Sequence, residues 1–175
     1  MTDERYLTLA EMRSVPGPYP MMVFADDARG WFSFAVKAKT KGYYGHFMWL
    51  IAPDALASQW LWFKLFCLDH FSGCHLKFVC GRHWTDAERA SLLDAIRRDL
   101  ALPWWKTLYD VPGVLFRLFG LRINVPWLQF CSERGAYLKI VDPEYDLVSP
   151  TPSELNAWTK ARGGRFNVFA RYSPD

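Results

Sequence analysis

Hydrophobic residues recur along the chain in two patterns, one typical of strands and one typical of amphipathic helices. Short apolar runs bounded by glycine, proline or charged residues predict buried strands. We expect strands over residues 21–25, 45–51, 59–67 and 75–82, and an alternating strand over residues 165–173. The sequence therefore predicts a small sheet whose strands are spread along the whole chain.

Helices are indicated by apolar positions at three- and four-residue spacing and by start signals. The stretches TDAE and TPSE each place a threonine three residues before a glutamate, which predicts capping boxes at Thr85–Glu88 and Thr151–Glu154. The first box begins an amphipathic helix over residues 86–100. Further helices are expected over 28–40, over 111–120, and directly after Cys131, where Ala136, Tyr137, Ile140 and Val141 would face inward.

This mixture indicates an α+β fold in which a small antiparallel sheet packs against helices. A length of 175 residues suits a single domain with a substantial core. No repeat or long linker divides the sequence, so we expect one domain over residues 1–175, with residues 1–17 as a lead-in segment.

Composition and charge exclude several classes of function. The chain is 51% hydrophobic and 17% aromatic, which favours a groove or partner surface lined by some of the rings. A net charge of +3 without a dense basic run argues against nucleic-acid binding. The longest apolar stretches, 47–68 and 111–130, contain charged residues, so we expect no transmembrane segment. The N-terminal residues contain no apolar core, so we expect no secretory signal and reduced cysteines.

Cys131 is the candidate nucleophile because it directly precedes a predicted helix. The partial positive charge at a helix start favours a thiolate, and the backbone N–H groups there are placed to hold an oxyanion. A thiol nucleophile also needs a base. Among the four histidines, His46 lies inside a predicted strand, between Gly45 and an apolar run. A strand-borne imidazole that faced Cys131 would complete a thiolate–imidazolium pair.

The order of these segments resembles the circularly permuted branch of the NlpC-type papain-like cysteine peptidases and amidases. In that branch the histidine strand comes first and the nucleophilic cysteine lies near the end. The resemblance covers roughly residues 18–172 and is carried by YPMMVFA, TKGYYGHFMWLI, LKFVCGRHWTDAERASLLDAIRRDL, LYD, FCSERGAYLKI and SPTPSEL. It implies a permuted papain-like fold with Cys131 as the nucleophile and His46 as the general base.

The same resemblance implies roles for further residues. In this branch a polar residue, commonly acidic, lies on the strand after the histidine and orients the imidazole. No carboxylate is present on ASQWLWFKL, so Gln59 is the candidate, with Ser58 behind it. The substrate pocket would include Tyr109 and Asp110 from LYD and Ser132 and Glu133 beside the nucleophile. No cofactor or metal is implied.

The function that the resemblance implies is hydrolysis of an amide bond in a cell-wall (peptidoglycan) stem peptide, in a bacterial or phage setting. The expected location is the cytoplasm or a phage virion. One alternative is a lipid acyltransferase or thioesterase that uses the same dyad, with segment 111–130 contacting an acyl chain, a membrane surface or a protein partner. Another is a non-enzymatic structural or interaction protein, for example of a phage particle, with a relic dyad.

A zinc site is a further alternative. Cys67 and His70, and again Cys80 and His83, have the short spacing of zinc ligands. Strand alternation, however, would place Cys80 inward with Leu76 and Phe78, as an ordinary buried cysteine. The pattern favours core packing over metal binding in this segment.

Overall fold

The structure is a computed structural model that describes residues 5–26, 42–108, 131–148 and 150–174. The helices predicted over 28–40 and 111–120 lie outside these ranges, as do Tyr109, Asp110 and the remainder of segment 111–130. The described residues contain the predicted histidine strand, the predicted cysteine helix and both predicted capping boxes.

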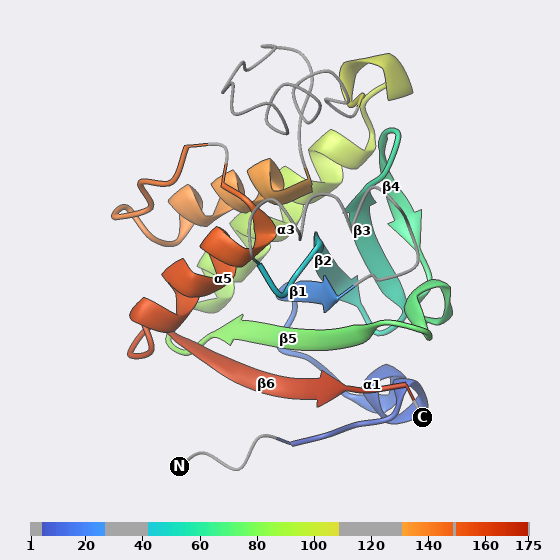
Figure 1. Cartoon of the computed structure of the whole chain (residues 1–175). Coiled ribbons are helices and arrows are strands. Elements are labelled where there is room, and N and C mark those ends of the chain that lie inside the picture. The colour runs from blue at the N-terminus through green and yellow to red at the C-terminus, as the bar shows by residue number, and fades with distance from the viewer. Residues whose placement is uncertain (1–4, 27–41, 109–130, 149, 175) are drawn as a thin grey trace.

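Six strands form one antiparallel sheet (Figure 1). They are β1 Met21–Asp26, β2 His46–Ala52, β3 Ala55–Gln59, β4 Phe63–Phe66, β5 His75–Gly81 and β6 Phe166–Tyr172. Their order across the sheet is β4-β3-β2-β1-β5-β6, and each neighbouring pair is antiparallel. The predicted α+β class is confirmed, and four of the five predicted strands agree with the structure to within one residue at each end.

The strand predicted over residues 59–67 is wrong, because the chain reverses inside this segment. Gln59 ends β3, Phe63 begins β4, and the two strands pair with each other. The reversal contains no glycine or proline, and its residues are apolar like those of the strands, so the sequence gives no turn signal there. A distant residue helps to hold the turn, since the hydroxyl of Thr107 accepts a hydrogen bond of 3.3 Å from the backbone N–H of Phe63.

Side-chain alternation divides the core between the two faces of the sheet. One face, called here the α1 face, is covered by α1 (Leu9–Ser14) and the 3₁₀ helix η1 (Leu68–Phe71). The other, the α3 face, is covered by α3 (Asp86–Leu100), the 3₁₀ helix η3 (Cys131–Ile140) and α5 (Pro152–Ala161). Figure 1 shows α3 and α5 together on one side of the sheet and α1 on the other.

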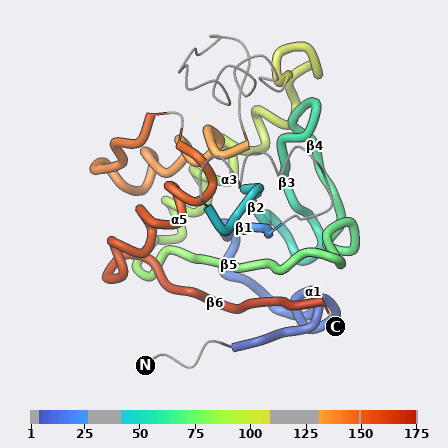
Figure 2. Tube along the Cα trace, viewed as in Figure 1, coloured from blue at the N-terminus to red at the C-terminus, as the bar shows by residue number. Residues whose placement is uncertain are grey.

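Both predicted capping boxes are confirmed, at the starts of α3 and α5. A third, between Thr8 and Glu11, begins α1 inside the segment expected to be a lead-in. The same segment covers the edge of the sheet at β6. The backbone N–H of Leu7 donates to the carbonyl of Arg171 at 2.9 Å, and the backbone N–H of Arg171 donates to the carbonyl of Arg5 at 2.8 Å. Figure 2 shows this N-terminal stretch alongside β6. None of the helices that the structure describes is long and apolar enough to cross a membrane.

The helix after Cys131 is a 3₁₀ helix, and the face predicted for it is correct at two of the four positions. Tyr137 and Val141 are partly buried against the core of the α3 face, whereas Ala136 and Ile140 are not. A 3₁₀ helix has three residues per turn, so positions three apart lie on one row. Its buried residues follow this period: Cys131, Ser132, Arg134, Gly135 and Leu138. Ala136 and Ile140, which were expected to face inward from an α-helical period, are exposed.

Candidate functional site

Cys131 is the first residue of η3, and its side chain is buried. Two contacts fix this end of η3. The hydroxyl of the neighbouring Ser132 donates a hydrogen bond to the carbonyl of Pro150, just before α5. The indole of Trp49 on β2 donates to the carbonyl of Arg134 at 3.0 Å. The start of η3 is therefore held between β2 and the segment that leads into α5.

His46 is the first residue of β2 and lies opposite Ala25 of β1. Its Nε2 and the hydroxyl oxygen of Ser58 are joined by a hydrogen bond of 2.7 Å. The ring stacks on Phe71 with an interplanar angle of 18° and meets the edge of Trp60 at a centroid distance of 6.2 Å. In the tautomer that carries its proton on Nε2, this N–H donates to Ser58 and Nδ1 holds the basic lone pair.

Gln59 does not orient His46, although the sequence made it the first candidate. Successive residues of β3 point to opposite faces, so Ser58 shares the α1 face with His46 and Gln59 points to the α3 face. There the Gln59 amide donates to the carbonyl of Thr107 and accepts hydrogen bonds from Arg134. The orienting contact predicted for Gln59 is made by Ser58, because strand alternation separates the two neighbours.

A buried polar network around Arg134 fastens η3 to the rest of the α3 face. Its guanidinium forms an ion pair with Asp99 of α3, donates to the hydroxyl of Tyr137 at 2.9 Å, and lies 4.2 Å from the ring centre of Phe63. The Tyr137 hydroxyl donates in turn to Asp99, and burial raises the pKa of Tyr137. No pattern in the sequence marks Arg134, because the partners of its side chain on α3, β3 and β4 are far away in the chain.

The segments that carry Cys131 and His46 are both bonded to residues 150–153. Ser153, in the first turn of α5, bonds through its hydroxyl to the backbone N–H and carbonyl of Tyr44, shortly before His46. Ser132 bonds to Pro150 in the same short segment. The His46 side chain, however, leaves β2 on the α1 face, whereas η3 packs on the α3 face. The His46 ring therefore lies on the face of the sheet opposite to the one that η3 covers.

Of the remaining predicted site residues, two lie on η3 and two lie outside the described ranges. Ser132 is buried, and Glu133 is half-buried in the first turn of η3. Tyr109 and Asp110 adjoin Leu108, which pairs with Trp62, but they lie outside the described ranges themselves.

The zinc alternative gains no support from the placement of the four residues. Cys80 is buried in the core of the α1 face, and its thiol donates to the Asn167 side chain at 3.0 Å. Burial raises the pKa of this thiol. His70 lies among aromatic rings, 4.7 Å from the ring centre of Phe66. Within the described ranges, no group of three or more His, Cys, Asp or Glu residues is arranged to hold a metal ion.

A group of exposed apolar side chains includes one neighbour of His46, the ring of Trp60. Its members, called here the apolar rim, are Trp60, Leu61, Leu102, Trp104 and Trp105. They come from the β3–β4 turn and from the chain at and before the 3₁₀ helix η2 (Trp104–Lys106). Thr107 joins the two parts, because its carbonyl accepts a hydrogen bond from Gln59 and its hydroxyl accepts one from Phe63. Exposed tryptophans in such a group are typical of a binding surface.

A scan against models of known protein families finds no match for this sequence. A search of curated proteins finds no significant match either.

Proposed function

We propose that this protein is a cysteine hydrolase that cleaves an amide bond, with Cys131 as the nucleophile and His46 as the general base. The observation that carries the proposal is the common anchoring of both residues. The start of η3 and the approach to β2 are each tied to the segment 150–153, through Ser132 and through Tyr44. The imidazole is also held in one orientation by a hydroxyl, as a catalytic base requires.

Each residue has a defined role in the proposed reaction. His46 Nδ1 accepts the thiol proton, and the Cys131 thiolate attacks the substrate carbonyl carbon. Backbone N–H groups at the start of η3 stabilise the negative oxygen of the tetrahedral intermediate. The imidazolium then protonates the leaving amine, the C–N bond breaks, and a thioester remains. Water, deprotonated by the same imidazole, releases the acid and restores the thiol. Ser58 keeps the proton of Nε2 in place throughout.

The substrate class follows from the resemblance of the chain to permuted NlpC-type enzymes. On that basis we assign the peptide part of peptidoglycan as the substrate, in a bacterial or phage setting, and a permuted papain-like fold for the domain. The antiparallel sheet with a cysteine at the start of a helix and a histidine at the start of a strand supports this assignment.

The decisive experiment is the pH dependence of alkylation by iodoacetamide, measured for each cysteine by mass spectrometry. The chain contains its own references: Cys67 is exposed, whereas Cys74 and Cys80 are buried. We expect Cys131 to be alkylated with a midpoint clearly below the value of about 8.5 for a free thiol. In a His46→Ala variant this midpoint should rise toward that of an ordinary thiol, while the profile of Cys67 stays unchanged.

The opposite outcome is equally informative. If the Cys131 profile is the same in the native protein and in His46→Ala, the two residues do not act together and the proposed reaction is wrong. Because Cys131 is buried, the experiment is repeated in denaturant, where the four thiols should react alike. Thermal unfolding of His46→Ala shows whether the variant keeps its fold.

A second candidate is an acyltransferase or thioesterase that acts on lipid with the same residues. The apolar rim favours it, because the ring centre of its member Trp60 lies 6.2 Å from that of His46. Aromatic side chains of this kind settle at the interface between a bilayer and water. This candidate predicts that hydrolysis of acyl esters rises with chain length and with added vesicles, and that Trp104→Ser with Trp105→Ser removes the dependence on vesicles. Cleavage of cell-wall peptides without any response to vesicles would exclude it.

A further inference from the structure

The apolar rim is built from two segments that the fold fastens together. Trp60 and Leu61 lie in the turn between β3 and β4, and Trp104 and Trp105 begin η2. Thr107 is 1% exposed and bonds to both strands that the turn joins, through its carbonyl and its hydroxyl. Figure 1 shows the turn and η2 (olive) at the same end of the molecule. Buried polar contacts therefore hold the two parts of the rim next to each other.

The side chains of the rim are strongly exposed for their size. Leu61 is 63% exposed, and Trp104 and Trp105 are 56% and 57% exposed. The rings of these two tryptophans meet edge to face, with their centres 5.8 Å apart. A group of large apolar side chains that remains in water is typical of a surface that contacts a protein or a membrane.

The charges of the same two segments are almost all positive. Residues 59–66 and 97–106 contain four cationic side chains and one acidic side chain. The acidic residue, Asp99, already forms an ion pair with Arg134. The segments that supply the rim therefore attract negative charge.

The cations lie close to the apolar side chains. Lys106 is exposed and ends η2, directly after the two tryptophans. Lys64 on β4 holds its ammonium 4.8 Å from the ring centre of Trp62. Arg97 and Arg98 are exposed in the last turn of α3, shortly before η2. An apolar group edged by cations complements a layer that is apolar inside and negatively charged at its surface.

We propose that the apolar rim docks on the surface of a membrane that contains anionic lipids. The indoles of Trp104 and Trp105 lie at the level of the headgroups, where tryptophan settles. Leu61 reaches the boundary of the acyl chains, and Lys64 and Lys106 keep their ammonium groups among the lipid phosphates. Docking of this kind needs no membrane-spanning helix. It concerns where the protein lies and not what it cleaves, so it is independent of the proposed hydrolase chemistry.

The test is flotation of the full chain with lipid vesicles, without any substrate. Vesicles of phosphatidylcholine alone are compared with vesicles in which about one lipid in three is phosphatidylglycerol. We expect the protein to float with the anionic vesicles, to float less with the neutral ones, and to detach as salt is raised. Trp104→Ser with Trp105→Ser should lower the partition coefficient at least about tenfold, because buried apolar area is lost. Lys106→Gln should lower it about fivefold.

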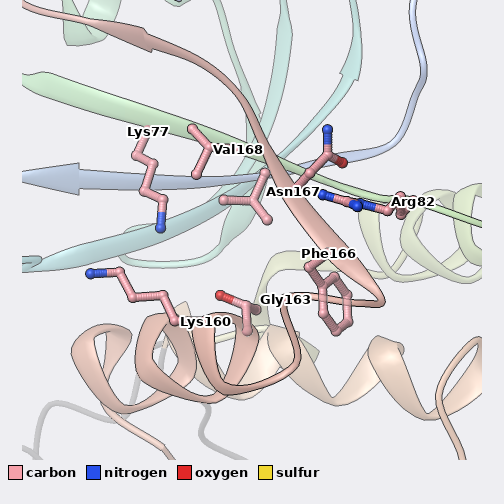
Figure 3. Close-up of a pocket in the computed structure, with 9 residues that line it drawn as sticks. Lys77, Arg82, Lys160, Gly163, Phe166, Asn167 and Val168 are labelled. Atoms are coloured by element: carbon pink, nitrogen blue, oxygen red, sulfur yellow. The ribbon is translucent and has the colours of Figure 1, made fainter. Parts of the chain in front are cut away.

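Each substitution has a matched control elsewhere on the surface. Tyr6→Ser removes a side chain that is 66% exposed on the stretch paired with β6, the edge of the sheet opposite to β4. Lys160→Gln removes an exposed lysine at the end of α5, beside a cavity between α5, β5 and β6 (Figure 3). Both controls should partition within about twofold of the native protein, because neither belongs to the rim.

Several results would overturn the proposal. Absence of flotation with both kinds of vesicles would exclude docking on lipid. Equal losses in the tryptophan double variant and in Tyr6→Ser, or in Lys106→Gln and Lys160→Gln, would show that binding does not depend on the rim. A dimer that the double variant loses, without binding to vesicles, would make the rim an interface between two copies of the chain.

The fold of each variant is checked by thermal unfolding. If the tryptophan double variant unfolds, Leu61→Ser decides, because it alters the rim from the other segment and should also weaken flotation. No reaction is measured in this experiment. Its outcome is therefore separate from the alkylation profile of Cys131, and either proposal can fail while the other holds.

Discussion

The guanidinium of Arg134 donates two hydrogen bonds to the side-chain oxygen of Gln59, at 3.2 Å from Nε and 3.1 Å from Nη2. These bonds join the helix that begins with Cys131 to the last residue of β3. Both side chains are almost fully buried, so neither has water as a substitute partner. Gln59 therefore holds the cysteine helix in place, while its neighbour Ser58 holds the histidine.

Arg134→Ala should lower the free energy of unfolding by about 2–4 kcal/mol, because Gln59, Tyr137 and Asp99 all lose a buried partner. This expected loss is smaller than the loss for a fully buried ion pair, because the Asp99 side chain is 31% exposed. Urea unfolding measures the change. Arg98→Ala, at an exposed arginine of α3, should change stability by less than about 0.5 kcal/mol. Similar effects of the two substitutions would contradict the structural role of the network.

Ser58→Ala and Gln59→Ala should separate function from stability at adjacent positions. Ser58→Ala removes the hydroxyl that holds His46. The lost hydrogen bond contributes roughly 1 kcal/mol, so alkylation of Cys131 at pH 7 should slow about fivefold. Gln59→Ala should lower the free energy of unfolding by about 2–3 kcal/mol, because it leaves Arg134 and the Thr107 carbonyl without this partner.

The same two measurements, alkylation rate and urea unfolding, are made on both variants. If Gln59→Ala slows alkylation more than Ser58→Ala while the fold persists, the orienting role assigned to Ser58 is wrong. Ser58→Ala should slow the alkylation of Cys131 by no more than His46→Ala does.

Gly81→Ala should destabilise the protein by about 1–3 kcal/mol through overpacking. A Cβ on Gly81 would lie 2.1 Å from ring atoms of Trp84. That ring is held by an edge contact with Phe166 and by the Arg89 guanidinium above it, so it has little room to shift. Gly164→Ala is the control, because its Cβ would meet no described atom within 4 Å. Thermal unfolding should show a clear loss for the first variant and a neutral or slightly stabilising change for the second.

The capping box of α3 should make part of the stability depend on pH. Backbone and hydroxyl hydrogen bonds from Thr85 lower the pKa of Glu88 from its ordinary value of 4.5. The folded state therefore holds this proton less tightly than the unfolded state, and the contribution is present above pH 4.5 and lost as pH falls through the lowered pKa.

Glu88→Gln removes this titration, so the difference in melting temperature between the native protein and the variant should be largest near neutral pH and should shrink in acid. Asp94→Asn removes an exposed carboxylate of the same helix outside the box and serves as the control. A constant difference across the pH range would show that the Glu88 carboxylate does not contribute through its charge.

Features that depend on neighbours in the chain were determined by the sequence alone. The capping boxes at Thr85 and Thr151 follow from a spacing of three residues, and the structure confirms both. The strands at β1, β2 and β5 follow from short apolar runs with clear boundaries. Local hydrogen bonds and local burial decide these elements, so no distant residue is needed to predict them.

Features that depend on the pairing of distant segments were decided only by the tertiary structure. Ser58 contacts His46 because β3 pairs with β2 in a register that sets Ser58 opposite Met48, on the α1 face. A shift by one residue would have put Gln59 there instead. Arg134 and Lys77 are buried charges whose partners, Gln59 and Asn156, lie in other parts of the chain. The cost of burying a charge is offset only where folding brings such partners within hydrogen-bond distance, and no local pattern records that distance.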